Sequence, residues 1–175
     1  MVMKFRPLKE NEIEVKVKQV RENGLVALLY KTARTDMDLL DETVGAENWT
    51  NDYKDIKGNL YCGIAVKDAG AWIWKWDCGI ESREDEEGNE KKGEASDAFK
   101  RAGFRWGIGR ELYTSPFIWV PALQANIKKG NNGKFSCYDK FSVEKIVYSE
   151  DGRRITGLAI WNDTKKARAF VWKEE

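Results

Sequence analysis

A cluster of basic residues stands between positions 98 and 110 of this 175-residue chain. Lys100, Arg101, Arg105 and Arg110 lie here with no acidic residue among them, although the formal net charge of the chain is only +1. Arginine and lysine beside aromatic residues suit a phosphate backbone whose bases splay alongside. The stretch predicts a nucleic-acid contact, and the alternative is an ordinary solvated helix face.

Two other residue patterns could support chemistry of a different class. Asp52 and Lys54, like Glu14 and Lys16, have the spacing at which a strand can present a carboxylate and a lysine to a magnesium ion and a water. Such pairs arise by chance in a chain that is 34% charged. A magnesium nuclease that uses Asp52 and Lys54 is therefore kept as an alternative hypothesis.

Several catalytic classes are disfavoured by the residues that the sequence lacks. The chain has no histidine, which removes the usual general base near neutral pH, the Ser-His-Asp triad and most transition-metal sites. The segment from Gly58 to Gly63 is followed by Ile64 and Ala65, where a phosphate-binding loop needs lysine and serine or threonine. We expect no cofactor, and the three cysteines are interpreted as reduced thiols.

Tryptophan is frequent, with eight residues in the chain. Trp72, Trp74 and Trp76 share one face of a predicted strand, where they could stack bases as single-strand binders do. The preferred interpretation is that this face packs against a helix in the core, and base stacking stays open as the alternative.

The periodicity of apolar residues predicts an α+β fold. Residues 13–18 and 25–30 form an N-terminal hairpin, and a short helix follows, capped by Thr35 or Asp36 and ended by Gly45. Strands at about 48–56, 59–67 and 71–80 form an antiparallel β-meander, which packs on a helix whose stripe contains Ala95, Phe99, Ala102 and Trp106. Strands near 141–148, 155–161 and 167–172 form a C-terminal β-meander. Ala98, Ala102 and Gly103 are expected to let the helix approach the sheet closely.

The length of the chain fits one domain over residues 1–175. No apolar run approaches the roughly 20 residues that cross a bilayer, and the N-terminus lacks the apolar segment of a secretory signal. We therefore expect a soluble cytoplasmic protein.

The order of these motifs resembles a known family. One helix with "VGAENW" at its end, three strands ending in "WDCGIESRE" and a helix containing "EASDAFKRAGFRWGIG" resemble the Rad-fifty-two family of single-strand annealing proteins, in particular its bacteriophage Sak-type branch. The likeness covers about residues 25–115, with residues 116–175 as a β extension. It implies a β-β-β-α core, assembly into homo-oligomeric rings or helical filaments, and ATP-independent annealing of single-stranded DNA in recombination and double-strand break repair.

The resemblance also implies roles for individual residues. Lys100 and Arg101 match the helix positions that grip phosphates, and Arg34 lies near the place of an arginine close to the bases. Phe104 stands where the family keeps a third basic residue, and Arg105 is the candidate to replace it. The predicted DNA-binding residues are Lys100, Arg101, Arg105, Arg34, Lys31 and Arg110.

The resemblance leaves partners and alternatives to be tested. Expected partners are single-stranded DNA, further copies of the chain and an ssDNA-coating protein, in the cytoplasm of a bacterial host that carries the gene on a phage or prophage. The acidic stretch 84–90 is interpreted as a solvated loop, or as a surface that repels DNA or meets a neighbouring protomer. A monomeric protein that protects single strands without annealing them is a third functional hypothesis.

Overall fold

The computed structural model describes residues 4–80 and 90–175, and the acidic stretch 84–90 lies outside the side chains that it describes. The chain forms two compact units, which are treated separately below. The first comprises residues 4–6, 31–80 and 90–109, and the second comprises residues 7–30 and 110–175. The fold is α+β, as predicted. The extent of a single domain over residues 1–175 stays a prediction.

The first unit contains the predicted antiparallel meander. Strands β3 (Trp49–Ile56), β4 (Asn59–Asp68) and β5 (Ala71–Cys78) pair in that order. Lys57 and Gly58 form the first turn, and Ala69 and Gly70 the second, all four with positive φ (55°, 76°, 48° and 86°). Two left-handed residues in a two-residue loop match the twist of the flanking strands, which is why this meander is so tight.

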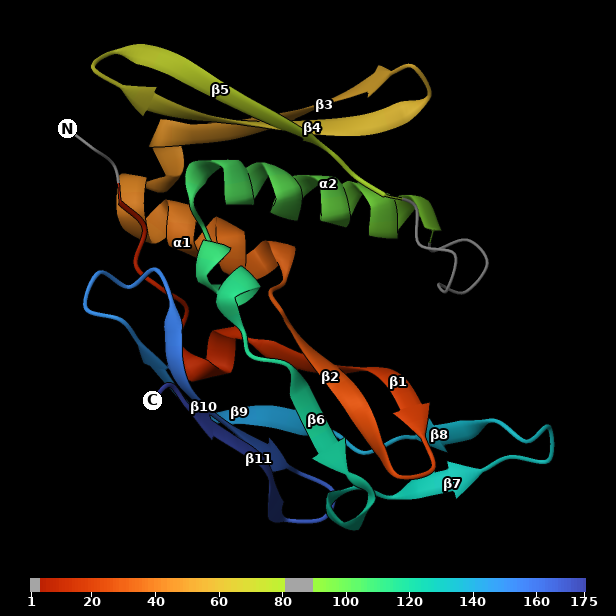
Figure 1. The fold of residues 1–175 in the computed structure, drawn as a ribbon. Helices are drawn as coiled ribbons and strands as arrows, with labels where there is room; N and C mark the ends of the chain where they lie inside the picture. The colour runs from red at the N-terminus through yellow and green to blue at the C-terminus, as the bar shows by residue number, and fades with distance from the viewer. Residues whose placement is uncertain (1–3, 81–89) are drawn as a thin grey trace. The chain divides into compact units, whose positions relative to one another are not determined.

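Two helices complete the first unit. Helix α2 (Glu90–Trp106) lies along one face of the sheet, and helix α1 (Ala33–Val44) packs against α2 (Figure 1). Helix α1 begins three or four residues earlier than predicted, because the hydroxyl of Thr32, instead of a side chain at Thr35 or Asp36, accepts the capping hydrogen bond from the Thr35 amide. Gly45 ends the helix, as predicted.

The core of the first unit lies between the sheet and α2. Phe99 is 1% exposed, and the other core side chains, each 0% exposed, are Cys62, Ile64 and Val66 of β4 with Ala98 and Ala102 of α2. Trp106 is half-buried and donates from its indole N–H to the carbonyl of Ile64 at 2.9 Å. Burial of these apolar side chains fixes α2 on the sheet and thereby sets which of its flanks faces solvent.

Two expectations about this packing are wrong. Trp72 and Trp74 are 44% and 40% exposed, because their cross-strand partners, Lys67 and Ala65, belong to the sheet face opposite the buried side chains of β4. Gly103 allows the approach of α1, not of the sheet: a Cβ atom at Gly103 would lie 2.3 Å from a carboxylate oxygen of Asp36.

The second unit joins the predicted N-terminal hairpin and C-terminal meander in a single sheet, with the strand order β11-β10-β9-β1-β2-β6. Pairing of Val15 with Phe141 connects the two parts of this sheet. Its strands, in chain order, are β1 (Glu14–Arg21), β2 (Gly24–Tyr30), β6 (Ile118–Pro121), β9 (Phe141–Tyr148), β10 (Ile155–Asn162) and β11 (Ala167–Lys173).

Shorter elements complete the second unit. Strands β7 (Ile127–Lys129) and β8 (Phe135–Cys137) form a separate hairpin. Short 3-10 helices span Glu10–Glu12, Arg110–Thr114 and Ala122–Gln124, and a further one, Ala46–Asn48, belongs to the first unit. Across residues 4–80 and 90–175, no helix has the length and apolar content that a membrane-spanning helix requires.

Candidate nucleic-acid interface

Three of the predicted basic residues lie on α2 outside its apolar stripe, Arg101 and Arg105 toward β5 and Lys100 about 100–140° around the helix from them. The side chains of Lys100, Arg101 and Arg105 are 23%, 38% and 60% exposed. Arg101 and Arg105 are four residues apart, so they share a helix face and point toward the same neighbouring strand. Because Ala98, Phe99 and Ala102 anchor the apolar stripe in the core, these cations are held at the surface.

Asp77 of β5 is the acidic partner of both arginines. The Nε atom of Arg105 donates to Asp77 Oδ2 at 3.0 Å, and Arg101 Nε lies 3.5 Å from Asp77 Oδ1. Burial by itself would raise the pKa of Asp77, but the hydrogen bonds from Arg105 and the Cys78 amide, with the two guanidinium charges, hold it below its ordinary value. Asp77 is therefore charged at neutral pH and neutralises part of the charge of Arg101 and Arg105.

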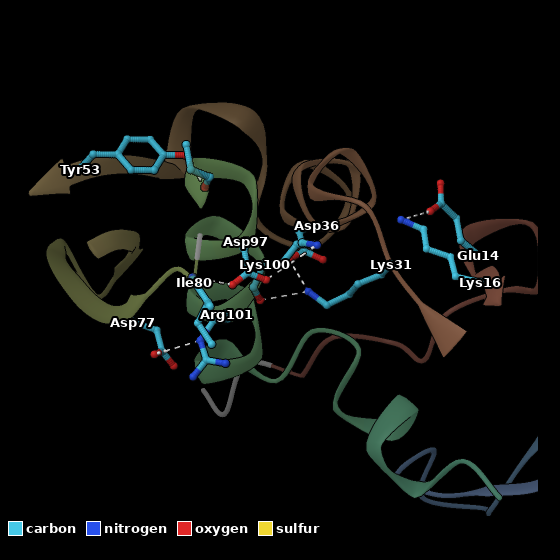
Figure 2. A network of polar contacts seen from close by, with 11 residues as sticks. Glu14, Lys16, Lys31, Asp36, Tyr53, Asp77, Ile80, Asp97, Lys100 and Arg101 are labelled. Carbon is cyan, nitrogen blue, oxygen red and sulfur yellow. Dashed lines mark hydrogen bonds and ion pairs between the residues drawn. The ribbon is translucent and has the colours of Figure 1, made fainter. Parts of the chain in front are cut away.

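Lys100 is less tightly paired than the two arginines. Its ammonium lies 4.0 Å from Asp97 Oδ1, while the other oxygen of Asp97 accepts a hydrogen bond from the Ile80 amide at 3.0 Å. Figure 2 shows Lys100, Arg101 and their acidic partners around α2. Contacts of this length on a partly exposed surface contribute little stability, so a phosphate can displace them.

Arg34 is a further exposed cation, on α1. It is exposed in the first helical turn, where a positive charge is unfavourable beside the helix dipole. Nearby, the ammonium of Lys31 donates to the backbone carbonyl of Lys100 at 3.2 Å, which places the start of α1 against the middle of α2. We call Arg34, Lys100, Arg101 and Arg105 the basic surface.

Lys31 has a different environment from the other predicted contacts. Its side chain is 1% exposed and forms an ion pair with the fully buried carboxylate of Asp36. The same ammonium lies 4.1 Å from the centre of the Phe104 ring. The Lys31 ammonium therefore occupies the space beside Phe104. Because Asp36 neutralises its charge and the side chain is buried from solvent, Lys31 is not part of the candidate interface.

The remaining candidates lie elsewhere. Arg110 is exposed but belongs to the second unit, and it is not part of the basic surface. Asp52 and Lys54 are exposed on β3, 3.9 Å apart, on the sheet face away from α2. Within the described residues, no group of three or more Cys, Asp or Glu side chains could hold a metal ion.

Sequence reasoning did not identify Asp77 and Lys75 as partners of α2. Lys75 donates to the carbonyl of Arg105 at 3.1 Å, and its ammonium lies 4.2 Å from the centre of the Trp106 ring. The alternation of β5 places Lys75 and Asp77 together on one face. The three tryptophans of the opposite face predict the core on that side instead, so this pattern alone does not identify the two residues as partners of α2.

Comparison with known proteins gives one match, to a family model. Residues 6–132 match the family model described as Rad52/22 family double-strand break repair protein. The match extends beyond the 25–115 range of the resemblance and includes the whole basic surface. No curated protein and no solved structure matches the chain.

Proposed function

The chain belongs to the Rad52/22 family of double-strand break repair proteins, and from this premise we propose that it anneals complementary single strands of DNA without ATP. Membership of this family indicates that the chain acts in DNA repair and recombination and that it binds DNA. The finer assignment, to single strands and to annealing by this chain, rests on the basic surface.

One observation supports the proposal: α2 carries Lys100, Arg101 and Arg105 outside its apolar stripe, and Arg34 is exposed in the first turn of α1. Side chains of this kind neutralise phosphates and fix the position of a strand, but they read no base sequence. A strand held by its phosphates keeps its Watson–Crick edges accessible. Binding many strands on neighbouring copies raises the local concentration of complements, which accelerates pairing without any covalent step.

The proposal includes assembly of the protein. We place the chain in the Sak-type phage branch, acting as a ring or helical filament of identical protomers and receiving strands from an ssDNA-coating protein. The basic surface of one protomer offers four cations, which is a short contact, so a continuous strand needs several protomers in a row. Electron microscopy at micromolar concentration tests this directly, and a discrete monomer would contradict it.

An annealing assay separates the proposed function from its competitors. Two complementary oligonucleotides that carry a donor and an acceptor dye are mixed with the protein, with and without ATP and Mg²⁺. We expect faster duplex formation in all conditions. Strand cleavage that requires Mg²⁺ would instead support the nuclease that uses Asp52 and Lys54. Tight binding with no faster pairing would support a protein that only protects single strands.

Replacement of Lys100 and Arg101 by alanine tests the surface itself. Loss of two phosphate contacts should weaken binding similarly for all sequences and reduce the slope of log K against log salt by about 1.4, at about 0.7 per contact. Arg153→Ala is the matched control, because its side chain is 80% exposed and lies in the second unit. Unchanged affinity of the double variant at low salt would place the binding surface elsewhere.

A further inference from the structure

The three tryptophans of β5 form a row on the sheet face that α2 leaves uncovered, with Trp72 and Trp74 exposed and Trp76 half-buried. Trp72 and Trp74 are 44% and 40% exposed, whereas Ile64 and Val66, on the α2 side of β4, are completely buried. Core aromatic side chains bury nearly all of their area, whereas these two leave about two fifths of theirs in solvent. Core packing therefore does not account for the exposed faces of Trp72 and Trp74.

Strand β4 has small residues opposite Trp74 and Trp76, so the two indoles can lie close to its backbone. Gly63 is the cross-strand partner of Trp76, and Ala65 is the partner of Trp74. A Cβ atom at Gly63 would lie 2.5 Å from the indole of Trp76, so the ring lies directly against the backbone. The rings of Trp74 and Trp76 are stacked, with centroids 5.4 Å apart and planes 21° apart. These two indoles are thus already ordered before any ligand arrives.

Cations accompany the aromatic rings on the same face. The ammonium of Lys54 lies 4.4 Å from the centre of the Trp76 ring, and exposed Lys67 is the cross-strand partner of Trp72. Asp52 contributes one negative charge, 3.9 Å from Lys54. Lysine is depleted from the centres of protein–protein interfaces, whereas lysine next to exposed aromatic rings is typical of surfaces that bind single-stranded nucleic acid.

We propose that Trp72, Trp74 and Trp76, with Lys54 and Lys67, form a base-stacking face for single-stranded nucleic acid. The exposed indoles of Trp72 and Trp74 stack on bases, which is tolerant of sequence, Trp76 supports the Trp74 ring from below, and the two lysines contact the adjacent phosphates. This face is distinct from the basic surface, since it lies on the opposite side of the sheet from α2. The inference does not depend on annealing, because stacking requires only an unpaired strand.

Photochemical crosslinking tests the stacking directly. A single-stranded oligonucleotide containing 5-iodouracil is irradiated with the full-length protein, and crosslinked peptides are identified by mass spectrometry. We expect crosslinks within residues 71–78. Their absence from this segment, at a concentration where the strand is fully bound, would overturn the proposal. A crosslink together with no annealing would reject the proposed function and leave this inference intact.

Binding measurements on variants separate stacking from charge. Trp74→Ala should weaken binding to single strands by about fivefold or more, the loss of one stacked base, without changing the salt slope. Trp74→Phe should restore most of the affinity, because it keeps an aromatic ring. Trp172→Ala, at a half-buried tryptophan of the second unit, is the control. If Trp74→Ala keeps full affinity but lowers the sedimentation coefficient, the face binds another copy of the chain and the proposal is wrong.

Discussion

Replacement of Asp77 by asparagine should strengthen the binding of single-stranded DNA. Asp77 holds Arg101 and Arg105 at 3.5 and 3.0 Å, and its side chain is 17% exposed. A phosphate that binds the side of either guanidinium opposite Asp77 would lie roughly 7 Å from the Asp77 carboxylate, because the guanidinium makes one charge-assisted contact to each of the two anions. The bound strand therefore experiences repulsion from Asp77, which asparagine removes while keeping a similar shape.

The size of this effect follows from the position of Asp77 near the surface. One charge pair at about 7 Å interacts by about 0.6 kcal/mol at a dielectric constant of 80 and by about 1.2 kcal/mol at 40. Asp77→Asn should therefore raise affinity about three- to eightfold, since about 1.4 kcal/mol corresponds to a factor of ten. The salt slope should become steeper by up to about 0.7, because the arginines release an additional counterion. Loss of two partly exposed ion pairs should lower the free energy of unfolding by about 1 kcal/mol.

Fluorescence anisotropy of a labelled oligonucleotide across a salt series measures both quantities, and urea denaturation measures stability. Asp151→Asn, which removes the partner of Arg153 at 3.9 Å in the second unit, is the matched control. A folded Asp77→Asn protein whose affinity is equal to or below that of the wild type would show that these arginines do not face the strand.

Two further predictions concern stability. Lys31→Met should lower the free energy of unfolding by about 3 kcal/mol in urea denaturation, because it leaves the carboxylate of Asp36 buried without its ion-pair partner; a loss below about 1 kcal/mol would contradict this account. The unfolding midpoint should also depend on pH on both sides of neutrality. The pKa of Asp77 is lowered in the folded protein, so its stabilisation is present above about pH 4, the ordinary value, and is lost as pH falls through the folded pKa. Burial, the largest cause, raises the pKa of Cys62 from 9.0 to about 11, so about 2 kcal/mol of stability should be lost as pH rises from about 9 to 11; Cys62→Ala should remove this alkaline loss, and its persistence would assign it to another group.

The sequence predicted most of the fold because its signals are local. Two-residue turns with glycine at Gly58 and Gly70 fixed the meander, and helical spacing of Phe99 and Ala102 placed one flank of α2 in the core. Pairing of Val15 with Phe141 was not predictable, since alternation in a strand indicates which faces it has but not which distant strand lies beside it.

The candidate site was predictable in part for the same reason. The absence of acidic residues between positions 98 and 110 identified Lys100, Arg101 and Arg105 as candidates. It did not reveal that both arginines pair with Asp77, which lies twenty-four residues or more away along the chain. Nothing in the sequence around Lys31 indicates that its side chain is buried, because α2, which covers it, is distant in the sequence. Trp72 and Trp74 were placed on the correct shared face, but composition suggested that this face was buried, and only the cross-strand partners show which face α2 covers.

The buried ion pair between Lys31 and Asp36 has a mechanical consequence for the two helices. Gly103 lets Asp36 approach α2, and Lys31 donates to the carbonyl of Lys100, so a slip of α1 by one turn, about 5.4 Å, would break this hydrogen bond and move Asp36 away from Gly103, although the ion pair itself moves with α1. Loss of a hydrogen bond from a buried charged group costs about 1.5–3 kcal/mol. The spacing between Arg34 and Lys100 is therefore set by the protein before DNA binds. A strand bound to both helices, as proposed, would have to follow this fixed spacing.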